Sequence, residues 1–129
     1  ENTDIALSPN AVAMGMLTYE APKDGALAGL SVSLIGKHVG QQFLDNTSNE
    51  GRALAAYTTL DAVVRAEHTL PTGQALTLSV FGNNLLNAMY SATGWTYSYR
   101  YGGPESTVTE NYVYPQAGRH GFVTLAVEF

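Results

Sequence analysis

The sequence predicts an all-β protein: an antiparallel transmembrane β-barrel segment of about five meandering strands, with short periplasmic turns and long extracellular loops. Apolar and polar residues alternate over several runs of about ten residues, the period of a strand with two different faces. The connections between these runs are alternately short and long. Charged residues make up only 13% of the chain, about half of the ~25% found in an average soluble domain. A strand with a wholly apolar face has to bury that face, and lipid is one place where it does so.

Composition excludes several classes of function. The formal net charge is −5 and lysine and arginine do not cluster, so we expect no nucleic-acid partner. The chain has no cysteine, which excludes disulfides and thiolate-based metal or redox sites. The longest apolar stretch near the start, residues 11–17, is far shorter than the ~20 residues of a membrane helix. The chain begins with Glu1 and no signal-peptide pattern follows, so we expect a processed form or a piece of a longer protein.

The first part of the chain predicts two strands and a loop. Residues 10–20 and 29–39 alternate in polarity, and residues 21–25 between them contain a proline and an Asp-Gly pair, which are typical of a turn. Ile35 interrupts the alternation of the second strand, so the pattern does not fix the register of that strand. Residues 41–56 have no clean period and contain a predicted loop at residues 45–50.

Residues 57–70 and 75–83 predict the next two strands, joined by a Pro-Thr-Gly turn at residues 71–73. The first of them is the more informative, because one face is apolar and the other is charged. The apolar face comprises Leu60, Ala62, Val64 and Ala66, and the charged face comprises Asp61, Arg65 and Glu67.

Residues 84–118 are too long for a plain loop of a compact domain, and part of them predicts a two-stranded ribbon. Four aromatic residues alternate with small or polar ones, a Gly-Gly-Pro turn follows at residues 102–104, and residues 108–114 return along the ribbon. The aromatic residues are Trp95, Tyr97, Tyr99 and Tyr101.

The last predicted strand, residues 119–129, alternates strictly and ends on an aromatic residue. Its two faces differ sharply in polarity. Phe129, Val127, Leu125 and Val123 share one face, and Glu128, Ala126 and Thr124 share the other. Counted back from this strand, both short turns fall on one side of the membrane, which is the periplasmic side in outer-membrane barrels.

An ordered set of stretches carries a family resemblance. They are Ser8-Pro9-Asn10 with Leu17-Thr18-Tyr19, Val39 to Asn49, Asn83 to Asn87 with Tyr90, Tyr97 to Gly103, and Tyr112 to Gly118, closed by Phe129. In this order they resemble the C-terminal part of the β-barrel of TonB-dependent outer-membrane receptors, of the Bacteroidetes type. The resemblance spans nearly all of residues 1–129, which we therefore interpret as one C-terminal barrel segment.

The resemblance implies a barrel of about 22 strands closed by a plug, which imports a scarce nutrient with energy delivered by TonB. The nutrient would be a metal chelate, a vitamin, or an oligosaccharide or peptide. About five strands cannot close around a pore, so we expect the plug and the remaining strands as partners, on the same chain or another one. TonB would act indirectly, through the plug.

The resemblance also implies a place in the outer membrane of a Gram-negative bacterium. Outer-membrane lipid and the barrel-assembly machinery are then further partners. The resemblance gives Phe129, with Val127 and Leu125 before it, the role of an assembly signal.

The aromatic stripe is the main candidate for ligand contact, because aromatic faces stack on sugars, haem-like rings and cations. Packing between loop ribbons, or a place in the aromatic girdle at the outer membrane interface, explains the same pattern. The candidate ligand-facing residues are Trp95, Tyr97, Tyr99, Arg100 and Tyr101, together with Asp45 and Asn46 from the predicted loop.

The charged face of the third strand is expected to line the barrel lumen. Asp61, Arg65 and Glu67 would then border a ligand pathway or the plug, or form the ordinary polar lining of a large barrel.

A metal site is not expected. Asp45, Thr47 and Asn49 have the opening spacing of a calcium loop, but Glu50 and Ala56 stand where that motif requires Gly and Glu. A turn with Asx hydrogen bonds is expected there instead.

Two further patterns are weak. His38 and His120 both fall near the loop side, but the three histidines of the chain lack the spacing of metal ligands. Residues 46–48 fit the short glycosylation pattern, which is common by chance. No catalytic motif occurs, so we expect neither an enzyme nor a cofactor.

Three functions remain open at this point. The first is nutrient uptake by a TonB-dependent receptor, to which this chain contributes the last barrel strands and two extracellular loops. The second is a soluble β-rich module that binds carbohydrate with the aromatic stripe. The third is a structural barrel that does not transport.

Overall fold

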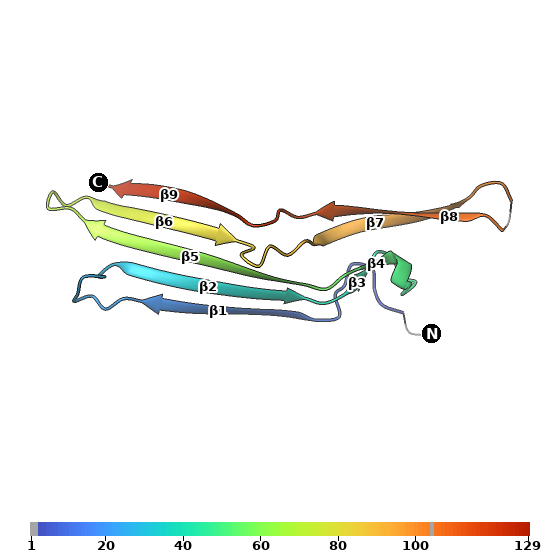
Figure 1. Cartoon of the computed structure of the whole chain (residues 1–129), viewed down its shortest axis with the longest axis horizontal. Helices are drawn as coiled ribbons and strands as arrows, with labels where there is room; N and C mark the ends of the chain where they lie inside the picture. Colours follow the sequence, from blue (N-terminus) through green and yellow to red (C-terminus); the bar gives the residue numbers. More distant parts are fainter. Residues whose placement is uncertain (1–2, 104) are drawn as a thin grey trace. The chain divides into compact units, whose positions relative to one another are not determined.

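The computed structural model describes residues 3–103 and 105–129 as an all-β chain with antiparallel sheets (Figure 1). The predicted fold class is confirmed at this level, and the long strands fall close to the predicted ranges. Pro104 of the predicted turn lies outside the described residues. The strands are β1 (Val12–Glu20), β2 (Leu30–Val39), β3 (Gln42–Phe43), β4 (Ala53–Leu54), β5 (Tyr57–Thr69), β6 (Ala75–Asn83), β7 (Ser91–Arg100), β8 (Thr107–Pro115) and β9 (His120–Glu128), and a 3-10 helix, η1, spans Glu50–Arg52. Within the described ranges, no helix has the length and apolar character that crossing a membrane requires.

The described residues form two compact units. The first, the ribbon unit, contains residues 3–13, His38–Tyr57 and most of Met89–Ala117. The second, the sheet unit, contains Met14–Lys37, Thr58–Ala88 and Gly118–Phe129.

The sheet unit is an antiparallel meander of five strands in the order β1-β2-β5-β6-β9 (Figure 1). Each strand lies beside the strand that precedes it in this series, as the alternation of short and long connections predicted. Strands β1 and β9 are the outermost strands of the sheet, so the described strands do not close into a barrel.

The register of β5, β6 and β9 separates polar from apolar residues. Strand β9 pairs with all nine residues of β6, from Ala75 opposite Glu128 to Asn83 opposite His120. On one face Leu76, Leu78 and Val80 lie opposite Val127, Leu125 and Val123, and on the other face Thr77 and Ser79 lie opposite Ala126 and Thr124. The predicted division of the last strand into two faces is confirmed.

The apolar face of the sheet is exposed. Leu125 and Val123 of β9 are 68% and 64% exposed, and Leu17 of β1 is 73% exposed. An exposed apolar surface that runs over several strands marks a surface made to contact something other than water.

Close packing fixes β9 against β6. Phe81 and Phe122 stack across the two strands, with ring centroids 4.4 Å apart and an interplanar angle of 14°. A Cβ atom at Gly121 would lie 2.5 Å from the carbonyl oxygen of Phe81. Only glycine allows this approach without a shift of the backbone.

The ribbon unit contains two short strands that the sequence did not predict. Residues 41–56, for which no period was found, contain the pair β3–β4 on either side of the predicted loop, with Gln42 opposite Leu54 and Phe43 opposite Ala53, and the helix η1 begins at Glu50, the last residue of that loop. The buried apolar side chains of the described residues are Val39, Phe43, Leu44 and Leu54, and all of these except Val39 belong to this segment. Strands of two residues are too short to show a period, so polarity alone could not reveal them.

The predicted Asx turn within this segment is confirmed. The Thr47 amide donates to Asp45 Oδ1 over 3.1 Å. The Gly51 amide donates to Asn49 Oδ1 over 2.8 Å, so Asn49 caps η1.

Strands β7 and β8 form the predicted ribbon (Figure 1). Trp95 lies opposite Tyr112, Tyr97 opposite Glu110 and Tyr99 opposite Val108, with a bulge between Ser91 and Thr93. Alternation along these strands gives the ribbon an aromatic face and a small polar face.

Candidate functional site

The small polar face of the ribbon is anchored to residues 42–54. The Asn111 side chain donates to the carbonyl of Gly51 over 2.7 Å, and the Gln42 amide donates to the carbonyl of Ala92 over 3.0 Å. A Cβ atom at Gly94 would lie 3.0 Å from Leu44 Cδ2. The ribbon therefore lies directly on the segment that contains the buried core.

Arg52 is the centre of this anchor. Its guanidinium pairs with Asp45 and donates to Ser98 Oγ over 2.7 Å and Thr109 Oγ1 over 3.3 Å. The hydroxyls of Ser98 and Thr109 are themselves 2.8 Å apart, on β7 and β8. One planar cation thus joins η1, the Asx turn and both strands of the ribbon.

The electrostatics of Asp45 reflect this arrangement. The hydrogen bond from the Thr47 hydroxyl, together with those from Arg52, lowers the pKa of Asp45, although burial of the carboxyl acts in the opposite direction. The carboxylate is therefore the stable form at neutral pH.

The aromatic face of the ribbon points away from the anchored face, because neighbouring residues of a strand point to opposite sides. Trp95 stacks on Tyr112, with centroids 4.7 Å apart, and on Tyr97, with centroids 5.3 Å apart. Tyr97 and Tyr99 continue the stack, with centroids 5.8 Å apart. The four rings are 39% to 45% exposed.

Glu110 lies within this aromatic cluster and accepts three phenol hydrogen bonds. The Tyr97 and Tyr112 hydroxyls both donate to Oε2 over 2.7 Å. The Tyr99 hydroxyl donates to Oε1 over 3.2 Å. We call these three tyrosines, Glu110 and Trp95 the tyrosine–glutamate cluster.

Ionisation of the cluster follows from these hydrogen bonds. The bonds from Tyr112 and Tyr97 lower the pKa of Glu110, because they stabilise its carboxylate. The same bonds raise the pKa of Tyr97 and of Tyr112, and the charge of Glu110 raises the pKa of Tyr99. At neutral pH the cluster therefore contains one carboxylate and three neutral phenols.

The structure separates the predicted ligand-facing residues into three groups. Trp95, Tyr97 and Tyr99 lie together in the stack. Tyr101 is 76% exposed beyond the end of the stack, and Arg100 lies opposite Thr107 on the anchored face.

Asp45 and Asn46 form the third group, and both side chains make contacts within the ribbon unit. Asp45 pairs with Arg52, and Asn46 Oδ1 accepts from the Ala6 amide over 2.6 Å. The side chains of Asp45 and Asn46 therefore hold the segment to which the ribbon is anchored, and they do not belong to the aromatic face.

Sequence reasoning missed Glu110 and Tyr112. Both lie on β8, and their place beside Tyr97 and Trp95 depends on the register of the ribbon. Counting outward from the Gly-Gly pair at residues 102–103 would pair Tyr97 with Val108, whereas the observed register pairs Tyr97 with Glu110, so the turn sequence alone did not reveal this neighbour.

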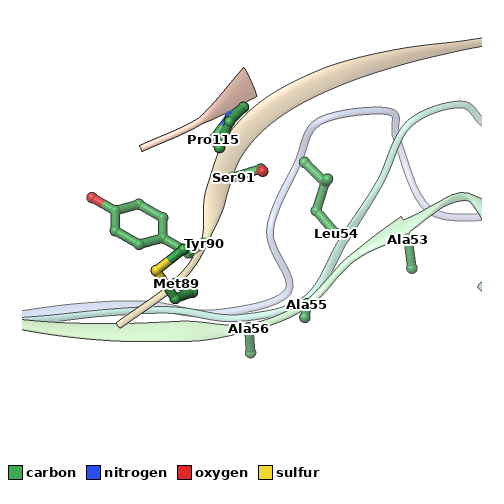
Figure 2. Close-up of a pocket in the computed structure, with 8 residues that line it drawn as sticks. All are labelled: Ala53, Leu54, Ala55, Ala56, Met89, Tyr90, Ser91 and Pro115. Atoms are coloured by element: carbon green, nitrogen blue, oxygen red, sulfur yellow. The ribbon is translucent and has the colours of Figure 1, made fainter. Parts of the chain in front are cut away.

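A second feature of the ribbon unit is an open pocket of about 340 Å³ (Figure 2). Small apolar residues 53–56, with Leu54 buried, line one part of it, and Met89, Tyr90, Ser91 and Pro115 line the rest. Tyr90 stacks on Tyr57, with centroids 4.0 Å apart. The lining holds no charged side chain, so the pocket offers mainly apolar contact.

The charged residues of β5 lie in the sheet unit. Arg65 and Glu67 form an ion pair of 2.8 Å, which places both on one face, and they border an open pocket of about 320 Å³ with Glu20 and Lys23. Asp61 accepts from the Asn84 amide over 2.7 Å, so its carboxylate holds the start of the connection that follows β6.

The described residues contain no group of three or more histidine, cysteine, aspartate or glutamate side chains able to hold a metal ion. His38 and His120 lie on β2 and β9, which are separated by β5 and β6 in the sheet order.

Comparisons with known proteins assign no family. Neither a protein-family model nor a curated protein matches this sequence. The resemblance to TonB-dependent receptors therefore stays a prediction from the sequence.

Proposed function

We propose that this chain forms part of the barrel wall of a TonB-dependent receptor in the outer membrane of a Gram-negative bacterium. Its task is structural and transport-related rather than enzymatic. The sheet unit supplies five neighbouring strands of the wall, and residues 41–56 and 84–118 supply two extracellular loops. The transported nutrient is a metal chelate, a vitamin, or an oligosaccharide or peptide.

The two faces of the five-stranded sheet carry this proposal. Leu76, Leu78 and Val80 of β6 share a face with Val123, Leu125 and Val127 of β9, while Ser79 and Thr124 share the other. A membrane barrel requires this division, because one face contacts lipid and the other lines the lumen. Leu125 and Val123 are largely exposed in the chain by itself, and lipid would cover them in a complete barrel.

The open edges of the sheet support a requirement for partners. Strands β1 and β9 are outermost in the described sheet, and unpaired strand edges are not tolerated in lipid. The proposal therefore includes the remaining barrel strands and a plug, with TonB acting through the plug and the barrel-assembly machinery inserting the whole. The polar face with Arg65 and Glu67 then lines the lumen.

Partition between buffer and lipid tests the membrane part of this proposal. The chain is refolded by dilution into plain buffer or into phospholipid vesicles, and vesicles are then floated through a density gradient. The proposal expects aggregation of the chain in buffer, and strand structure with flotation when the chain is refolded together with the remaining strands of the barrel. A monomeric, folded chain in buffer that does not float would refute it.

The carbohydrate-binding alternative rests on the exposure of the aromatic face. Trp95, Tyr97 and Tyr99 are 39% to 45% exposed, which leaves room for a ligand. Their rings stack on one another with interplanar angles of 16° and 22°, so the ring faces that a sugar would need are largely occupied. This geometry favours the membrane proposal over the carbohydrate module.

Transport itself needs a separate test from barrel formation. In a cell that makes the complete receptor, deletion of TonB should abolish uptake while the receptor stays in the outer membrane. Uptake that survives the deletion would leave a barrel that is not energised by TonB.

A further inference from the structure

The tyrosine–glutamate cluster has an unusual arrangement of hydrogen-bond donors. A phenol has a single proton, and Tyr97, Tyr99 and Tyr112 each donate theirs to Glu110. Their remaining lone pairs can only accept, and an ionised carboxylate can also only accept. The polar atoms of the cluster itself therefore present acceptors alone, with a net charge of −1.

This arrangement selects the chemistry of a ligand. A neutral sugar hydroxyl both donates and accepts, and it brings no charge to offset that of Glu110. A guanidinium or primary ammonium group brings several donors, no acceptor and a positive charge.

The other charged groups of the ribbon unit leave the cluster negative. Arg52 lies on the anchored face and is paired with Asp45. Arg100 lies opposite Thr107, also on the anchored face. Neither arginine is placed to neutralise Glu110, so the charge of the cluster remains for a ligand.

We propose that the tyrosine–glutamate cluster is a binding site for an organic cation, a ligand with a guanidinium or primary ammonium group. The cation lies against Glu110 Oε1, which accepts only the 3.2 Å bond from Tyr99, with the aromatic stack beside it. This inference goes beyond the proposed transport function, since it concerns the ribbon alone and holds whether or not the chain inserts into a membrane.

Trp95 makes the site directly observable, because it is the only tryptophan of the chain and belongs to the stack. The full chain, folded in detergent or buffer, is titrated with Nα-acetylarginine methylamide while the tryptophan fluorescence is recorded. The matched probe is Nα-acetylcitrulline methylamide, which has the same shape and no charge. A maltooligosaccharide serves as the carbohydrate probe.

The proposal expects a saturable change with the arginine probe and binding weaker by about fivefold with the citrulline probe, the size of effect that an exposed charge pair produces. Equal responses to both probes, or saturation by the sugar alone, would overturn it.

Variants locate the effect. Glu110→Gln should weaken binding of the arginine probe by about fivefold, whereas Glu105→Gln, which removes one charge from the same ribbon outside the cluster, should leave it unchanged. Tyr99→Phe keeps the aromatic ring and frees Glu110 Oε1, so this variant should bind the arginine probe equally well or more tightly. It also keeps the proposal testable if the Glu110→Gln variant fails to fold. An equal loss in Glu105→Gln, or a loss in Tyr99→Phe, contradicts the proposal.

Discussion

Leu125 of β9 lies directly opposite Leu78 of β6, and the two side chains are 68% and 44% exposed. The preceding residue of β9, Thr124, lies opposite Ser79 and points to the other face. Leu125 therefore lies on the apolar face of the sheet, and its neighbour Thr124 lies on the polar face. This property allows the proposed membrane face to be tested with matched substitutions.

Leu125→Arg should prevent stable association with lipid, while Thr124→Arg should be tolerated. An arginine on the lipid face of a barrel costs about 2–4 kcal/mol near the bilayer midplane, and a lumen-facing one is solvated. Flotation of each variant with phospholipid vesicles, with the substitution made in the complete barrel, measures the difference. Equal flotation of the two variants would argue against a lipid-facing role for this face.

Gly121→Val should disrupt the pairing of β6 with β9. The added Cβ atom would lie 2.5 Å from the carbonyl oxygen of Phe81, and overpacking of this kind costs about 1–3 kcal/mol. Faster hydrogen exchange of the β9 amides is the expected result. Gly36→Val is the control, because an added Cβ atom at Gly36 meets nothing within 4 Å.

Arg52→Lys should loosen the ribbon from residues 42–54 without unfolding the sheet unit. Lysine keeps the charge but cannot reach Asp45, Ser98 and Thr109 with one planar fork, and hydrogen bonds to charged groups contribute about 1.5–3 kcal/mol. Amide exchange in β7 and β8 should accelerate relative to β6. Arg100→Lys should change little, and a similar acceleration in that variant would refute the anchoring role.

Asn84 should tolerate glycine better than alanine. Its φ is +50°, and its buried side chain exchanges hydrogen bonds with the Ala88 amide and carbonyl. Both substitutions lose these bonds, but only glycine relieves the left-handed backbone, which costs about 1–2 kcal/mol for other residues. Chemical denaturation should rank the variants in that order, and an alanine variant as stable as the glycine variant would contradict this account.

The tyrosine–glutamate cluster should weaken at both ends of the pH scale. The lowered pKa of Glu110 gives stability that is present above the ordinary glutamate value of 4.5 and is lost as pH falls through the lowered pKa. The raised pKa of Tyr97 gives stability that is present below the ordinary tyrosine value of 10.0 and is lost as pH rises through the raised pKa.

Glu110→Gln tests the cause of the tyrosine shifts. Without the carboxylate, Tyr97, Tyr99 and Tyr112 should ionise at lower pH, which the near-ultraviolet absorbance of tyrosinate records. The same variant should lower the stability gained between pH 4.5 and 10.0. A tyrosine titration that does not move would show that Glu110 is not the cause.

The long strands were predictable because their side chains alternate over nine or more residues. One apolar and one polar face produce a signal that needs no knowledge of neighbouring strands. The ribbon was predictable for the same reason, through Trp95, Tyr97 and Tyr99.

Two features were not predictable from local pattern. Phe43 and Leu44 belong to a core that is built from strands of two residues, which are too short to alternate. Glu110 acquires its role only from its place opposite Tyr97, and that place depends on the register of β7 and β8. Pairing between strands is long-range information, and polarity along one strand does not contain it.

The uninterrupted register of β6 and β9 has a consequence for how the gene tolerates change. Loss of a single codon within β9 would shift the remaining residues by one position and exchange the two faces of the strand beyond that point. Loss of two codons would shorten the strand and keep its faces. Evolution of this segment should therefore accept changes of length in steps of two residues more readily than in steps of one.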